Sequence, residues 1–200
     1  MNAFELDTQQ IDALREVANI GAGHAATALS QLTNRRILVD VPTVRIGSIP
    51  VASGEDGDYA TVRMQVLGDV TGETMQVFPP RTARRIAGIL TGSDGSETGG
   101  FGDMERSALV EAGNIIAGAY LNALSDFMGM LLLMSVPTMR LDAGPVPDVD
   151  TEGPGSGPGK ALVLDTRFRM EGDEQPLPGQ FVLVPDAPSI RAILEAINVA

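Results

Sequence analysis

One segment of this 200-residue chain occurs twice, at 11–32 and again 95 positions later at 106–127, and this repeat constrains the fold more than any other feature. Each copy carries apolar residues at helical spacing and, among them, three polar residues separated by four and then three positions. At 3.6 residues per turn, these three positions lie on one narrow stripe of a helix. Each copy therefore predicts a helix with one face to bury and one face to present to a partner.

The polar stripe uses nearly the same residue types in both copies. Its members are Asp12, Glu16 and Asn19 in the first copy and Ser107, Glu111 and Asn114 in the second. The apolar positions are Ile11, Leu14, Ala18, Ala25, Leu29 and Leu32, then Leu109, Ala112, Ile116, Leu121 and Leu124. The similarity continues into 41–45 and 136–140 at the same offset. It indicates an internal duplication, in which two units share one sheet across a pseudo-twofold axis.

The rest of each half predicts strands and a shorter helix. Asp7 and Gln10 form a capping box that begins the first helix, and Asn34 ends it. We expect strands at 37–41, 43–51, 59–67 and 74–78, the last two forming a hairpin, and a short helix at 81–90. In the second half we expect a long helix at 103–127, strands at 130–136, 161–170 and 180–184, and a terminal helix from about 188 to 198.

These elements predict one domain of mixed class. We expect an α/β (α+β) fold of two pseudo-symmetric halves, each with a long helix, several strands and a shorter helix, sharing one largely antiparallel sheet. The single domain spans 1–200, with repeats at about 5–92 and 103–199 joined by a linker rich in Gly, Ser and acidic residues. The Pro- and Gly-rich loop at 142–159 has no assigned role.

Composition excludes several classes of protein. An apolar content of 44% is enough for a hydrophobic core. The absence of cysteine excludes disulfides and thiolate sites. A net charge of −12 disfavours nucleic-acid binding, which requires clusters of Lys and Arg. The first ten residues lack a signal-peptide pattern, and the longest apolar block, near 130–134, is too short to span a bilayer. We therefore expect a cytoplasmic protein with no membrane insertion.

The two stripes carry a four-point motif. Each stripe is followed, after 22 residues, by a proline, which is Pro42 in the first copy and Pro137 in the second. The pattern of Asp or Ser, three residues, Glu, two residues, Asn, 22 residues and Pro resembles the signature of the CheC, CheX and FliY chemotaxis phosphatases. The presence of two copies is similar to the CheC-type members rather than to CheX, which carries one. We expect both prolines to fix the backbone at a strand entry, in support of the site.

The resemblance implies an enzyme, a protein aspartyl-phosphatase. Members of this family hydrolyse the aspartyl phosphate of the chemotaxis response regulator CheY. By resemblance, Glu16 and Glu111 pair with the active-site lysine of the regulator, while Asn19 and Asn114 enter its acidic pocket and orient the attacking water. An amide suits this task, because it donates and accepts hydrogen bonds and does not repel phosphoryl oxygens as a carboxylate would.

The same resemblance implies the cofactors and partners. No cofactor or metal of its own is expected, because the Mg²⁺ that neutralises the phosphoryl group is carried by the regulator. Some members of the family also bind the receptor deamidase CheD. An alternative function is therefore a weakly catalytic or non-catalytic docking module for phosphorylated CheY or for CheD. The residues leave open the relative activity of the two sites, the identity of the regulator and the oligomeric state.

Four other features suggest function less specifically. His24 lies off the polar stripe and is interpreted as structural. The run 148–153 resembles the start of a calcium loop but lacks the final glutamate, so a flexible acidic loop is favoured. Arg81, Arg84 and Arg85 form a basic helix face that is either solvated or meets an acidic partner. The glycines of 21–23 indicate a close approach, either by the second long helix or by the backbone of a partner.

Overall fold

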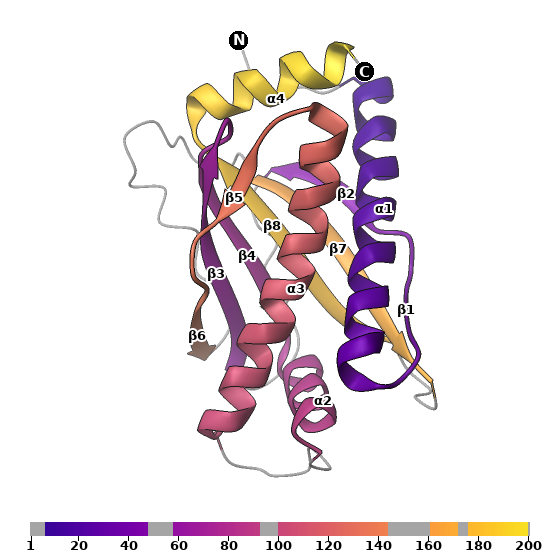
Figure 1. Ribbon diagram of the computed structural model, residues 1–200, viewed down its shortest axis with the longest axis vertical. Helices are drawn as coiled ribbons and strands as arrows, with labels where there is room; N and C mark the ends of the chain where they lie inside the picture. Colours follow the sequence, from indigo (N-terminus) through magenta and orange to yellow (C-terminus); the bar gives the residue numbers. More distant parts are fainter. Residues whose placement is uncertain (1–6, 48–57, 93–99, 144–160, 172–175, 200) are drawn as a thin grey trace.

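The computed structural model describes residues 7–47, 58–92, 100–143, 161–171 and 176–199. They form one eight-stranded sheet and four helices, and the two long helices lie side by side across one face of the sheet (Figure 1). Every strand pair is antiparallel. The predicted fold class, a mixed fold with a largely antiparallel sheet, is therefore confirmed.

The long helices begin and end where local sequence signals place them. Helix α1 spans Thr8–Thr33 and begins at the predicted capping box, in which Asp7 and Gln10 exchange two hydrogen bonds of 2.9 Å. It ends at Asn34, whose φ of 51° is left-handed. Helix α3 spans Asp103–Met128. The predicted helices are thus confirmed to within a few residues.

The strands follow one order across the sheet. They are β1 (Ile37–Val39), β2 (Thr43–Gly47), β3 (Asp58–Gly68), β4 (Gly72–Phe78), β5 (Leu132–Met134), β6 (Thr138–Ala143), β7 (Ala161–Met170) and β8 (Leu177–Pro185). The order is β1-β7-β8-β4-β3-β5, with β2 also on β7 and β6 also on β3. The predicted hairpin is confirmed, because β3 and β4 pair directly.

Each strand has a counterpart in the other half: β1 and β5, β2 and β6, β3 and β7, and β4 and β8. When each strand is replaced by its counterpart, the order reads the same from either edge of the sheet. β1 and β2 pair with β7, and β5 and β6 pair with β3 in the same way. The two halves meet where β4 pairs with β8, with Gln76 opposite Phe181. Each half therefore supplies two short strands to the sheet of the other half.

The shorter helices close the two ends of the layer of long helices. Helix α2 spans Pro80–Thr91, with proline in its first turn, and helix α4 spans Ala187–Val199 (Figure 1). Asp186 caps α4, accepting a 2.9 Å hydrogen bond from the backbone of Ser189. Buried residues from all four helices join one hydrophobic core with one face of the sheet.

The long helices pack through glycines as well as through the predicted apolar stripe. A Cβ atom added at Gly21 of α1 would lie 2.6 Å from Cδ1 and 3.0 Å from Cα of Tyr120 in α3, so the helices touch there. A Cβ atom at Gly113 of α3 would lie 2.7 Å from Cβ of Val62 in β3. The predicted core positions are buried, except that Ile11 is half-buried and Leu32 is 44% exposed.

Three strand predictions were wrong in detail. The apolar run 130–136 is not one strand: β5 covers only three residues, and Pro137 separates it from β6, which the sequence did not predict. The two short strands pair with different parts of β3, so the chain must shift between them. The strand predicted at 37–41 likewise ends at Val39. Strand β8 begins at Leu177, three residues before its predicted start, and most of the linker and of the loop at 142–159 lies outside the described residues.

Candidate functional site

The motif of the first copy lies on the exposed face of α1. Asp12, Glu16 and Asn19 are all exposed, whereas Leu14 and Val17 on the opposite side are buried. The structure therefore brings the three polar side chains to one side of the helix, where a protein partner has access to them.

The motif of the second copy occupies the same place on α3, but it is more covered. Ser107 and Glu111 are exposed, and Asn114 is half-buried. One turn beyond, a Cβ atom at Gly118 would lie 3.3 Å from Cε of Met134 in β5. At the equivalent Gly23 of α1, no described atom lies within 4 Å of such a Cβ. The two motif faces therefore differ in how closely a partner can approach the helix backbone.

The two motifs lie toward opposite ends of the helix pair. Helices α1 and α3 run in opposite directions, because α1 leads into β1 at one end of the sheet and α3 leads into β5 at the other (Figure 1). The helices touch where Gly21 meets Tyr120. Glu16 lies five residues before Gly21, and Glu111 lies nine residues before Tyr120. At 1.5 Å per residue, the two glutamates are offset by roughly 20 Å along the pair. The two motifs are therefore two separate candidate sites.

Among the described side chains, an ion pair lies on the first motif face and none on the second. Arg15 Nη1 donates to Asp12 Oδ1 at 2.7 Å, and the two side chains are 51% and 61% exposed. The equivalent positions in α3 hold Val110 and Ser107, which cannot form such a pair. Sequence reasoning missed Arg15, although its position four residues before Asn19 places it on the same side of the helix.

Each motif proline lies between two consecutive short strands. Pro42 is buried and directly precedes β2, and the half-buried Pro137 directly precedes β6. Their positions agree with the predicted strand entries. The residues before them, Val41 and Val136, are 65% and 84% exposed. Each motif therefore has an exposed valine on the segment that follows its helix.

The remaining sequence candidates do not join these sites. His24 is exposed on α1. Arg84 is half-buried, and its guanidinium lies 5.4 Å from the ring centroid of Phe101. The acidic run 148–153 lies outside the described residues. Within the part of the chain that the structure describes, no group of three or more His, Cys, Asp or Glu side chains is placed to hold a metal ion.

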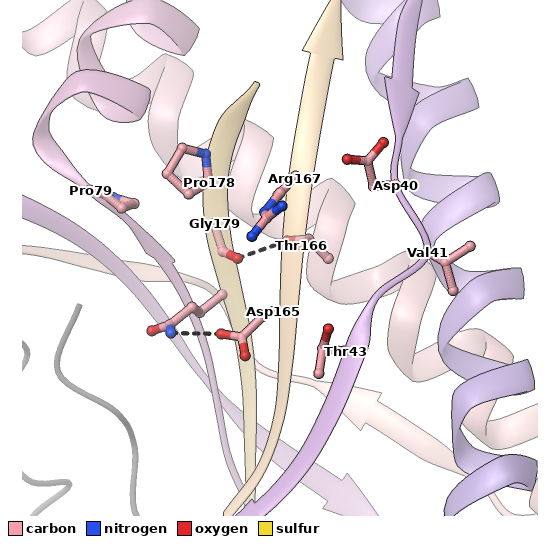
Figure 2. Close-up of a pocket in the computed structure, with 10 residues that line it drawn as sticks. Asp40, Val41, Thr43, Pro79, Asp165, Thr166, Arg167, Pro178 and Gly179 are labelled. Atoms are coloured by element: carbon pink, nitrogen blue, oxygen red, sulfur yellow. Dashed lines mark hydrogen bonds between the residues drawn. The ribbon is translucent and has the colours of Figure 1, made fainter. Parts of the chain in front are cut away.

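A pocket of about 350 Å³ lies between β7, β8 and the link from β1 to β2 (Figure 2). Its carboxylates are already paired: Asp165 accepts from Arg45 at 2.7 Å and from Gln180 at 2.8 Å, and Asp40 pairs with Arg169 at 2.9 Å. None of its lining residues belongs to the motifs. The motif residues therefore lie on open helix faces, an arrangement that fits a protein substrate.

Comparisons with known proteins agree with this architecture. The CheC-like family matches at residues 10–46 and 104–139, and these two segments contain both motifs. The CheY-P phosphatase CheC of Bacillus subtilis is 34% identical over 197 residues, which cover 95% of this chain and 94% of that protein. The flagellar motor switch phosphatase FliY of Bacillus subtilis is 28% identical over 141 residues, covering 68% of this chain and 37% of that protein.

A solved structure is similar over the whole chain. The crystal structure of Thermotoga maritima FliY superposes with a TM-score of 0.76 at 25% identity, covering 98% of this chain and 99% of the other. Among the described helices, none is both long enough and apolar enough to cross a membrane. The family match at both motif segments and the 34% identity to a CheC protein over nearly the full length place this chain in the CheC-like family.

Proposed function

We propose that this protein is a phosphatase that hydrolyses the aspartyl phosphate of a CheY-type response regulator. The observation that supports this most is the pair of Glu and Asn faces on α1 and α3, in which each side chain is exposed except the half-buried Asn114. They occur in a chain closely related to a protein named CheY-P phosphatase CheC. Open helix faces also fit a substrate that is itself a folded protein.

Each site combines a binding residue and a positioning residue. Glu16 and Glu111 form an ion pair with the active-site lysine of the regulator, which aligns the helix against the phosphorylated aspartate. Asn19 and Asn114, one turn away on the same stripe, enter the acidic pocket of the regulator. Their side-chain amides each accept a hydrogen bond from a water molecule and donate one toward the phosphoryl group.

The reaction then needs little covalent chemistry from this chain. The oriented water attacks phosphorus in line with the bond to the aspartyl oxygen, that bond breaks, and the aspartate of the regulator leaves as a carboxylate. Catalysis is mainly positioning, because holding the water in place removes the entropic cost of finding the attack geometry. The Mg²⁺ that neutralises the phosphoryl oxygens is bound by the regulator as part of the substrate, and we propose no cofactor for this chain.

A direct test follows phosphate loss from a purified regulator loaded with Mg²⁺ and phosphorylated. The wild-type protein at catalytic ratio should accelerate the decay. Asn19→Ala combined with Asn114→Ala should abolish most of this turnover and leave binding of the phosphorylated regulator largely intact, because water orientation acts on the transition state. Glu16→Ala with Glu111→Ala should weaken binding as well, because the ion pair forms in the ground state.

The outcomes separate the two functions considered for this chain. Equal loss of affinity and rate in the asparagine variants would show that the assigned roles are wrong. Stoichiometric binding with unchanged decay would favour a docking module. Binding of CheD stays a prediction, and faster regulator dephosphorylation on adding purified CheD would support it.

A further inference from the structure

The two motif faces differ in charge at equivalent positions. On α1, Arg15 lies one turn before Asn19 and is held by Asp12 at 2.7 Å. On α3 both members of this pair are replaced, by Val110 and Ser107. The acidic residue and the cation therefore change together between the two copies.

Stability does not explain this ion pair. Both side chains are at least half exposed, and an exposed pair three residues apart on a helix contributes little to folding. The contact does restrict the guanidinium to the side of α1 that carries the motif. One hydrogen bond to Asp12 leaves most of the five guanidinium N–H donors available for a partner.

The second face offers apolar surface instead. Met104 is 72% exposed and lies two turns before Glu111 on the motif stripe. Val110, at the position of Arg15, is half-buried, and the position equivalent to Met104 in α1 is the exposed, polar Gln9. Methionine adapts its shape to an apolar partner surface, whereas arginine selects anionic oxygens.

We propose that the two sites recognise the phosphorylated regulator by different chemistry. At the first site, Arg15 donates hydrogen bonds to anionic oxygens at the rim of the phosphorylation pocket of the regulator. At the second site, Met104 and Val110 contact its apolar surface. A guanidinium suits the first role, because it binds phosphate and carboxylate oxygens in a bidentate manner. It also offsets repulsion between an acidic partner and a chain of net charge −12. This inference rests on the proposed phosphatase function.

The test uses variants that retain one working site. Asn114→Ala leaves the first site and Asn19→Ala leaves the second, and regulator dephosphorylation is measured against regulator concentration at low and high NaCl. The KM of the first site should rise by about 3- to 10-fold with salt, whereas that of the second should change less than about twofold. Adding Arg15→Val to the first-site variant should raise KM by a similar factor at low salt, reduce its salt dependence to that of the second site and leave kcat nearly unchanged.

The reciprocal change provides a matched control. Val110→Arg with Ser107→Asp, placed in the variant that retains the second site, should increase the salt dependence of KM there. Arg15 and Val110 are not buried, so melting temperatures should change by less than about 2 °C. If one isolated site turns over too slowly, regulator binding is measured in the double asparagine variant. In that variant, Arg15→Val should weaken binding at low salt. Any effect of Val110→Ala on binding should be the same at low and high salt.

The results distinguish this inference from the proposed function. Equal salt dependence of the two sites, or an unchanged KM and affinity for Arg15→Val, would overturn the role of Arg15 and leave the phosphatase intact. Absence of accelerated decay with the wild-type protein would instead contradict the proposed function itself.

Discussion

Helices α1 and α3 carry the same motif and bury their opposite faces differently. Helix α1 uses Gly21 to lie against Tyr120 of α3, and the residue equivalent to Gly21 in α3 is the buried Ile116. Helix α3 uses Gly113 to lie against Val62 of the sheet, and its equivalent in α1 is the buried Ala18. The Glu and Asn of the presented face are thus kept in both copies while the packing face differs, since each helix has different neighbours.

The largest expected effect tests whether the presented faces are equivalent. Losing both asparagines should reduce regulator turnover by about 100- to 1000-fold, or about 3 to 4 kcal/mol in the barrier, as for loss of one positioned hydrogen-bond donor. Asn19→Ala and Asn114→Ala alone should each remove the turnover of one site. The ratio of the two residual rates, measured by regulator dephosphorylation, gives the relative activity of the sites. Rates equal to wild type in both single variants would place the chemistry elsewhere.

The next effect tests whether the packing faces differ as described. Gly21→Ala and Gly113→Ala should each destabilise the protein by about 1 to 3 kcal/mol, because the added methyl groups meet Tyr120 and Val62. Gly23→Ala should stabilise it by about 0.5 to 1 kcal/mol, because its methyl group enters open space and alanine favours a helix. Urea unfolding measures all three. Similar effects at Gly21 and Gly23 would argue against the contact between the helices.

Tyr120, at the contact between the two helices, should make folding stability depend on pH. Burial raises the pKa of Tyr120 well above its usual range. A raised pKa means that the folded state keeps a proton that the unfolded state loses. Stability is therefore fully present below about pH 10 and falls above it, with a slope approaching about 1.4 kcal/mol per pH unit. Tyr120→Phe should show a shallower loss in unfolding experiments between pH 9 and 11, and parallel profiles would contradict this assignment.

The smallest effect concerns the charged pair of the first site. Asp12→Ser gives α1 the residue that α3 carries, and it should change the free energy of unfolding by less than about 0.5 kcal/mol. Thermal unfolding checks this value. Arg15→Val should be equally mild. A large loss of stability in either variant would mean that the ion pair stabilises α1. The second copy has no such pair at the equivalent positions of α3.

Local signals predicted much of this molecule. The capping box at Asp7, the left-handed Asn34 and the hairpin of β3 and β4 depend on residues close together in sequence, and all were confirmed. The two motif faces follow from helical periodicity in the same way. Strand β6 was missed, because its run of alternating residues is short and its pairing partner, β3, lies about 75 residues earlier in the chain.

Sequence periodicity by itself determined that this chain has two long helices, each presenting Glu and Asn on one stripe. Residues one turn apart lie on the same side of a helix whatever its tertiary contacts are. Only the tertiary structure decided how the halves combine, through the pairing of β1 and β2 with β7 and of β5 and β6 with β3. It also decided that Gly21 contacts a helix and that Gly23 stays open. These features depend on contacts between segments far apart in the chain, and no local pattern specifies which of several apolar partners a residue will meet.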